Sequence, residues 1–485
     1  MLKHGVINIL SGFDRKEMTR FKAFAWSPYF NKHDEVRNLI DYFNGIYPHF
    51  TEQTCNRHII FPHVFPGAPH DQARLAVVFS YTRKLAEQFL IQEAFKEETQ
   101  PARVMLLGQL RKRKLFDQYE SLLERTEKEL EESAWRDGAH FQRMHAVAAE
   151  ADHFFTHAKK EERLGSLEQK QRSLDVYYLS TKLKDAVEMQ IRRNLRQFDY
   201  SSRLLEHVLK EVEHNMDLYA ATPTILLYYQ LYRMFSDTAH QFYYEARATL
   251  VRAKPFLPEP ELASIYNYFQ NYCIREINRN QEPFLDELFG LYQIQLEQDL
   301  LLEDGFLPEW HYKNITTTAI RLSKLEWIKN FLEQFRDKLR PEVAENAYCF
   351  NMAAYFHACE SYDKVLELLN QVTYSDIRYS LGARALLLRT YYELEEDEAL
   401  FSLVDSFRQF LQRHKLLADS RRNGYDHLFR FTRKAAQLRA ALGYSSAKKT
   451  KQELLRLEQE IDMAPSVFNK SWLQQKIRDL IEGRL

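Results

Sequence analysis

The sequence predicts an all-α protein whose C-terminal half is built from stacked helix pairs. Glycine and proline are scarce, at 13 and 14 of 485 residues, so the chain has few of the residues that close hairpins and tight βα loops. Apolar residues recur at intervals of three and four over long stretches, which places them on one face of a helix. A chain of this length exceeds one compact core, so we expect several domains or an elongated repeat stack.

Residues 1–95 are predicted to form a small helical domain. Ser11 precedes a helix-like run that Ser27-Pro28 ends, because the residue before proline avoids the helical region. A second helix is expected from Asp34 to Asn44, and a third begins after Asp71, which can cap it. The turn residues that indicate a loop between these two helices are Pro62, Pro66-Gly67 and Pro69.

Residues 96–166 are predicted to be a charged helical pair or connector. The run from Arg111 to Lys114 is basic and is compatible with a nucleic-acid contact. Six glutamates between Glu120 and Glu132 balance it, which favours a solvated helix surface.

Helix pairs recur from residue 167 to residue 412. The clearest pair spans Asn346 to Val372, with a turn at Glu360-Ser361. Equivalent pairs fit residues 223–253, 260–302, 309–339 and 377–412. Their spacing of roughly 34 to 40 residues is typical of tetratricopeptide repeats, which stack into a superhelix with a concave surface. We expect residues 413–485 to close this α-solenoid with capping helices.

Three short segments carry a likeness to known proteins: Ser27–Lys32, Asn271–Arg275 and Asn346–Asn351. They resemble an uncharacterised family of helical, tetratricopeptide-like proteins common in Bacteroidota, and the similarity also covers Phe65–Gly67 and Leu386–Leu394. The resemblance implies a bacterial origin and a helical repeat fold, and it implies no functional residue.

Charge and cysteine content restrict the environment and the partners. The 67 basic and 68 acidic residues nearly cancel, so no global field attracts nucleic acid or an anionic membrane. The four cysteines form no CxxC pair, which favours a reduced cytoplasmic compartment. No stretch reaches the roughly 18 uncharged apolar residues that a membrane span needs. We therefore expect a cytoplasmic protein without a membrane partner.

Motifs of catalysis and cofactor binding are missing from the sequence. It contains no GxxxxGK[ST], GxGxxG, HExxH or GxSxG pattern, so we expect neither enzymatic activity nor a cofactor. Glu150, His153 and His157 would share one helical face and could offer metal ligands. HxxxH is a weak pattern, however, and no second Glu-x-x-His helix accompanies it, so no metal site is predicted.

Two aromatic groups each allow a functional and a structural interpretation. The first could line a ligand groove, although packing between helix pairs is favoured; it comprises Tyr228, Tyr229, Tyr232, Phe235, Phe242, Tyr243 and Tyr244. The second interleaves basic residues with rings in a way compatible with single-stranded nucleic acid, although helix-end charges and solubility explain it equally; it comprises Arg421, Arg422, Tyr425, Phe429, Arg430, Phe431, Arg433, Lys434 and Arg439.

The sequence favours a non-catalytic interaction scaffold that holds a protein partner or peptide segment in the concave face of the stack. First helices line that face, so the predicted partner-binding residues are Lys313, Thr317, Ile320, Phe350, Ala354 and His357. Phe350 is expected to be a surface position whose change to serine leaves folding nearly intact. Six apolar residues are instead expected between helices: Leu325, Ile328, Leu332, Val365, Leu366 and Leu369. The alternative function is a nucleic-acid-binding regulator that uses the N-terminal domain or the basic C-terminal helices.

Overall fold

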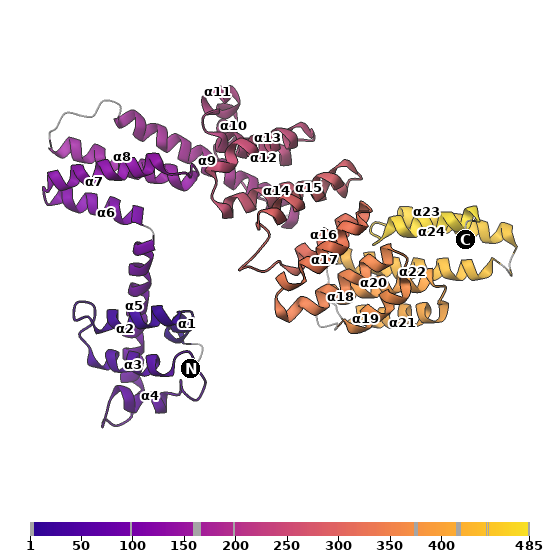
Figure 1. The fold of residues 1–485 in the computed structure, drawn as a ribbon, viewed down its shortest axis with the longest axis horizontal. Coiled ribbons are helices and arrows are strands. Elements are labelled where there is room, and N and C mark those ends of the chain that lie inside the picture. Colours follow the sequence, from indigo (N-terminus) through magenta and orange to yellow (C-terminus); the bar gives the residue numbers. More distant parts are fainter. Residues whose placement is uncertain are drawn as a thin grey trace. The chain divides into compact units, whose positions relative to one another are not determined.

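The computed structural model describes residues 4–97, 99–158, 166–196, 199–372, 377–413, 419–442, 444 and 446–483. Within these residues every regular element is helical, apart from one isolated bridge between Glu303 and Phe306 (Figure 1). The predicted all-α class is therefore confirmed. No helix of the described ranges is both long and apolar enough to cross a bilayer.

The chain divides into two compact units. The first comprises Met1–Arg233 and Glu245–Leu257, and the second comprises Met234–Tyr244 and Pro258–Leu485. Helices α1 to α11 lie in the first unit: α1 (Gly5–Ser11), α2 (Arg15–Trp26), α3 (Asp34–Ile46), α4 (Arg57–Val64), α5 (Gln72–Glu97), α6 (Thr99–Lys112), α7 (Phe116–Glu132), α8 (Gly138–Ala158), α9 (Ser166–Arg196), α10 (Leu205–His214) and α11 (Met216–Tyr219). Two helices hold residues of both units: α12 (Pro223–Ser236) and α13 (Gln241–Ala253).

The second unit continues with helices that follow each other at short intervals. They are α14 (Glu259–Ile277), α15 (Pro283–Glu297), α16 (Glu309–Arg321), α17 (Leu325–Gln334), α18 (Pro341–Ala358), α19 (Tyr362–Gln371), α20 (Ile377–Glu393), α21 (Asp397–Arg413), α22 (Asp419–Ala441), α23 (Ala447–Met463) and α24 (Lys470–Glu482). The predicted pairs 223–253, 260–302, 309–339, 346–372 and 377–412 each contain two helices, as expected.

Helices α1 to α5 surround one apolar core at the N-terminal end of the chain. Val36, Leu39, Ile40 and Phe43 of α3 are all buried in it, as the spacing predicts. Asp71 accepts hydrogen bonds from the backbone of Ala73 and Arg74 at the start of α5, so its predicted capping role is confirmed.

The helix expected after Ser11 is α2, and it ends before Ser27-Pro28 as predicted. Ser11 itself ends α1, and a reciprocal capping box formed by Asp14 and Glu17 starts α2 at Arg15. One expectation for this region is wrong. The segment expected to be a loop contains α4, although Pro62 lies inside it. The side chain of Asn56 caps α4, and burial of its apolar residues in the core stabilises the turns around the proline.

Residues 99–158 form three helices, α6, α7 and α8, where the sequence predicts a pair. The additional break follows α6, where Lys114 adopts a positive φ of 59° and no glycine or proline signals it. The three helices enclose their own apolar cluster, in which Tyr119 stacks on Phe154 with 3.9 Å between ring centroids.

The helices of the second unit pack in a regular order. Along α16 to α24, each helix packs against the next one in the chain. In addition α16 packs on α18, α18 on α20, α20 on α22, and α22 on α24 (Figure 1). Every other helix therefore belongs to one continuous row, which is the row that contains the predicted binding residues.

The pairs of this unit share one turn. Each first helix ends in a turn with a residue of positive φ, at Asn280, Ser323, Glu360 and Glu395. The next residue donates its backbone N–H to the carbonyl five positions back, as from Ser361 to Phe356. This is the Schellman arrangement, which satisfies the last carbonyls of a helix and here closes each pair without glycine. The predicted turn at Glu360-Ser361 is thereby confirmed.

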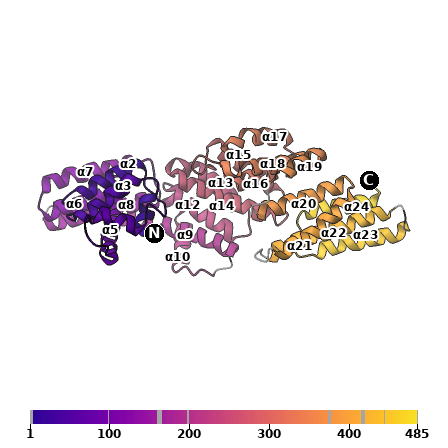
Figure 2. The same cartoon turned by 90° about the horizontal axis from the view of Figure 1, so that it is seen from below.

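Helices α20 to α24 share one apolar core, and they lie side by side in the view of Figure 2. The core joins Leu388 and Phe407 to Phe429, Leu457 and Ile477. The residues after 413 therefore continue the packing of the helix pairs before them.

Candidate partner-binding surface

Three consecutive first helices meet around Phe350. The Nζ atom of Lys313, on α16, lies 5.3 Å from the centroid of the Phe350 ring on α18. On its other side the ring abuts α20, where a β-carbon added to Gly382 would be only 3.0 Å from Phe350 Cζ. The phenyl ring thus fills the space between neighbouring pairs.

The six predicted binding residues fall into two classes. Thr317 is exposed, and its hydroxyl donates to the carbonyl of Lys313 at 2.9 Å. Lys313, Ile320 and Ala354 are half-buried along the same row of helices. Phe350 and His357, by contrast, are only 7% and 8% exposed. Their expected surface position is wrong, because α18 has a first helix packed on each side of it.

Most of the six apolar residues expected to lie between helices are buried. Ile328, Leu332, Val365 and Leu369 are buried, whereas Leu325 and Leu366 are half-buried.

His357 instead belongs to a buried polar cluster formed with α20. Its Nδ1 atom lies 3.4 Å from Nη2 of Arg389, and its ring meets Tyr362 edge-on with 5.4 Å between centroids. Burial, followed by the charges of Arg389 and Lys476, lowers the pKa of His357 to about 3. The imidazole is therefore neutral, and Nδ1 can accept a hydrogen bond from the guanidinium.

Helix α24 completes this cluster. The Cζ atom of Arg389 lies 5.3 Å from the centroid of the Trp472 ring. The indole Nε1 of Trp472 donates to Glu393 at 2.8 Å, and Nζ of Lys476 lies 2.7 Å from the other oxygen of Glu393. Glu393 thus has two partners, and neither is Arg389. No pattern in the sequence identifies this cluster, because its residues lie on α18, α19, α20 and α24.

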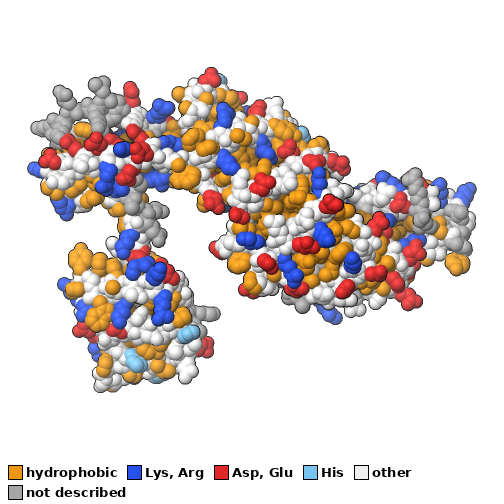
Figure 3. Space-filling view, viewed as in Figure 1, with side chains coloured by type: hydrophobic (Ala, Val, Ile, Leu, Met, Phe, Trp, Pro, Cys, Tyr) orange, Lys and Arg blue, Asp and Glu red, His pale blue; other side chains and the backbone are white. Residues whose placement is uncertain are grey.

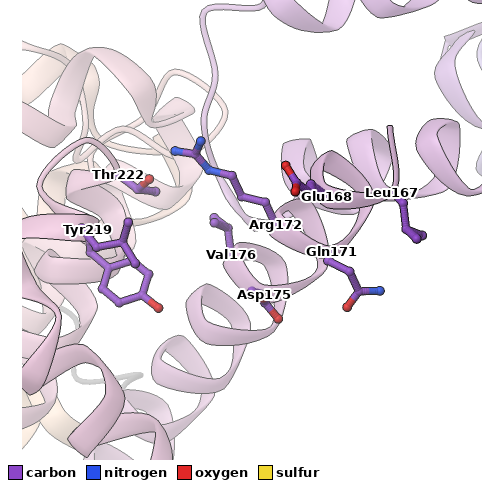
Figure 4. Close-up of a pocket in the computed structure, with 9 residues that line it drawn as sticks. Leu167, Glu168, Gln171, Arg172, Asp175, Val176, Tyr219 and Thr222 are labelled. Carbon is purple, nitrogen blue, oxygen red and sulfur yellow. The ribbon is translucent and has the colours of Figure 1, made fainter. Parts of the chain in front are cut away.

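A cleft in the first unit was also missed by the sequence analysis. It has a volume of about 600 Å³ and lies between the start of α9 and residues 218–222 (Figure 4). Figure 4 shows Arg172 and Val176 of α9 on one side and Tyr219 and Thr222 on the other. A second hollow of about 580 Å³ shares Arg172 and Val176 and extends toward Phe141 of α8. Leu218, which lines the first cleft, is 62% exposed.

Glu150, one of the three candidate metal ligands, is held by another partner. Glu150 pairs with Arg111, whose Nε atom lies 2.6 Å from Oε1 and whose Nη2 atom lies 3.3 Å from Oε2. The side chain of His157 lies outside the described residues. In the part of the chain that the structure describes, no group of three or more His, Cys, Asp or Glu residues could hold a metal ion.

The aromatic residues of 228–244 are largely structural. Tyr228, Tyr229 and Tyr243 are at most 2% exposed, whereas Tyr244 is half exposed. The hydroxyl of Tyr243 donates to Glu287 at 2.9 Å, and that of Tyr229 accepts from Arg233 at 3.0 Å. The predicted need of buried tyrosines for polar partners is met by these contacts.

The basic and aromatic residues of α22 also have structural partners. Phe429 stacks on Phe407 with 3.7 Å between centroids, and Arg433 pairs with Asp405 at 2.6 Å. Arg439 donates to Asp397 at 2.9 Å. These contacts favour the explanation by packing and charge complementation. Acidic and basic side chains are interspersed over the face visible in Figure 3.

Comparisons of the chain with protein-family models, with curated proteins and with solved structures found no match.

Proposed function

We propose that the chain is a non-catalytic scaffold that binds a segment of a protein partner along the row of first helices α16, α18 and α20, within a tetratricopeptide-like stack. The observation that carries the proposal is the direct packing of successive first helices on each other. The recurrence of one turn at Asn280, Ser323, Glu360 and Glu395, about 35 to 43 residues apart, supports the repeat assignment.

The partner surface comprises Lys313, Thr317, Ile320 and Ala354. Each retains exposed side-chain area on the row of first helices. Phe350 and His357 are buried under this surface and support it. The surface offers one cation, one hydroxyl and two aliphatic groups, a composition suited to a peptide with alternating apolar and polar side chains. The proposal rests on fold analogy in one respect, because stacks of this kind use their first helices for binding.

Site-specific photo-crosslinking in the native host tests this function. A photoreactive amino acid replaces Thr317 on α16, and a matched control replaces Lys329, which is exposed on the second helix α17. We expect a discrete crosslinked partner from position 317 that is absent from position 329. Lys313→Glu should weaken that crosslink while leaving the melting temperature nearly unchanged. Equal labelling from both positions, or no product under several growth conditions, would contradict the proposal.

A further inference from the structure

Arg389 is a half-buried charged residue whose guanidinium has few partners within the fold. Its Nε atom is enclosed by protein and donates to no acceptor, and among the described residues the guanidinium has only Nδ1 of His357 as a hydrogen-bond partner. Desolvation of a guanidinium is unfavourable unless a carboxylate or another anion compensates it. An arginine of this kind therefore calls for a partner that the described chain does not supply.

Nearby carboxylates do not meet this need. Glu393 lies one turn further along α20, but its two oxygens are held by Trp472 and Lys476. Burial lowers the pKa of Arg389 to about 10, and the charge of Glu393 offsets this only in part. The cluster contains two cations, Arg389 and Lys476, and one carboxylate, Glu393. Their charges sum to one positive charge.

We infer that the cluster formed by His357, Arg389 and Trp472 is a binding site for a single carboxylate group, bound by the Arg389 guanidinium. A guanidinium binds a carboxylate in its own plane through two parallel N–H donors. Trp472 lies over the guanidinium, with 5.3 Å between Cζ of Arg389 and the ring centroid, and the Arg389 residue as a whole keeps some exposed surface although its Nε atom is enclosed.

The charge balance selects a monoanion. A carboxylate cancels the one excess positive charge, whereas a dianionic phosphate would add a second negative charge close to Glu393. His357 is neutral and cannot offset that charge. The inference deepens the proposed function, because a bound segment would supply the carboxylate from an acidic side chain or from its chain terminus.

Nuclear magnetic resonance of the full chain, labelled with ¹⁵N in its five tryptophans, tests the site. The indole signal of Trp472 is identified from its loss in Trp472→Phe. Sodium acetate is added against sodium chloride at matched ionic strength. We expect a saturable shift of the Trp472 signal that is lost in Arg389→Met and retained in Arg433→Met, a control whose arginine already pairs with Asp405. Arg389→Lys, which keeps the charge but loses the planar donors, should weaken acetate binding roughly tenfold.

Further titrations separate the possible sources and anions. The α-amide of N-acetylglutamate presents a side-chain carboxylate, and N-acetylglycine presents a terminal one. The compound that binds more tightly shows whether the site prefers an acidic side chain or a chain terminus. Inorganic phosphate should bind more weakly than acetate. A shift that does not saturate, or that persists in Arg389→Met, would overturn the inference. If Arg389→Met does not fold, the test is the comparison of Arg389→Lys with the wild type. An acetate affinity that this substitution leaves unchanged counts against the site. Because these probes are small molecules, their failure is distinct from the absence of a crosslinked protein partner.

Discussion

The ring of Phe350 occupies the space beside Gly382 so closely that an added β-carbon would lie 3.0 Å from Cζ and 3.2 Å from Cε2. Glycine in a helix interior costs up to about 1 kcal/mol relative to alanine. Its presence in the middle of α20 is therefore explained by the approach of α18. The contact links two neighbouring pairs through residues 32 positions apart, and it makes the stacking of these pairs experimentally accessible.

Gly382→Ala should lower the stability of the second unit by about 1–3 kcal/mol, because the buried ring has little room to move. Gly290→Ala is the matched control, since it lies inside α15 with no atom within 4 Å of the added carbon. It should raise stability by up to about 1 kcal/mol. Urea unfolding monitored by circular dichroism measures both. Equal effects of the two alanines would show that α18 and α20 are not in this contact.

Phe350→Ser should reduce stability by about 3–5 kcal/mol, as expected when a buried phenyl ring is removed. The loss also deprives Lys313 of the aromatic face beneath its ammonium group. Thr317→Ala, on the exposed side of α16, should stay within about 0.5 kcal/mol. Thermal melts compare the two variants. Similar melting temperatures for the Phe350→Ser and Thr317→Ala variants would show that Phe350 is a surface residue.

The stability of the second unit should fall as the pH decreases from 6.5 toward 4. Burial lowers the pKa of His311 to about 4 from its ordinary 6.5. Above pH 6.5 the imidazole is neutral in both the folded and the unfolded chain, so the stability is fully present. Below this pH the unfolded chain binds a proton that the folded chain does not, at about 1.4 kcal/mol per pH unit.

His311→Leu should remove this contribution. Unfolding free energies at pH 7 and pH 5 should differ less in the variant than in the wild type, by about 2 kcal/mol. The wild type retains other titrating groups, including His357, so its own pH dependence does not vanish. Identical pH dependence in the two proteins would mean that His311 is protonated equally in both states.

Glu150→Ala should destabilise the cluster of α6, α7 and α8 by about 1–3 kcal/mol, because it leaves the largely buried charge of Arg111 without its carboxylate. Glu132→Ala removes an exposed pair, 3.9 Å from Lys128, and should cost less than about 0.5 kcal/mol. Hydrogen exchange of α6 and α8 reports the difference. Elemental analysis of untagged protein complements it: stoichiometric metal, lost in Glu150→Ala, would show a ligand role for Glu150 in place of the ion pair.

Local chemistry was enough to predict individual helices and their buried faces. The stripe Val36, Leu39, Ile40 and Phe43 needs only the period of 3.6 residues, and the cap at Asp71 needs only a short acceptor before a helix. The turn at Glu360-Ser361 was predicted in the same way. The cap of α2 is Asp14, whose capping-box partner Glu17 lies three residues later.

The sequence by itself determined the helical class, the paired order of α14 to α21 and the apolar face of each helix, because these depend on neighbours within a few positions. Tertiary structure alone decided which of the inward positions are covered. Phe350 and His357 share a helix face with Ala354, yet they are buried while Ala354 is half-buried, because α16 and α20 close over part of α18. It also placed Arg389 beside His357 and Trp472, residues 32 and 83 positions away, and no local periodicity carries information about contacts of that range.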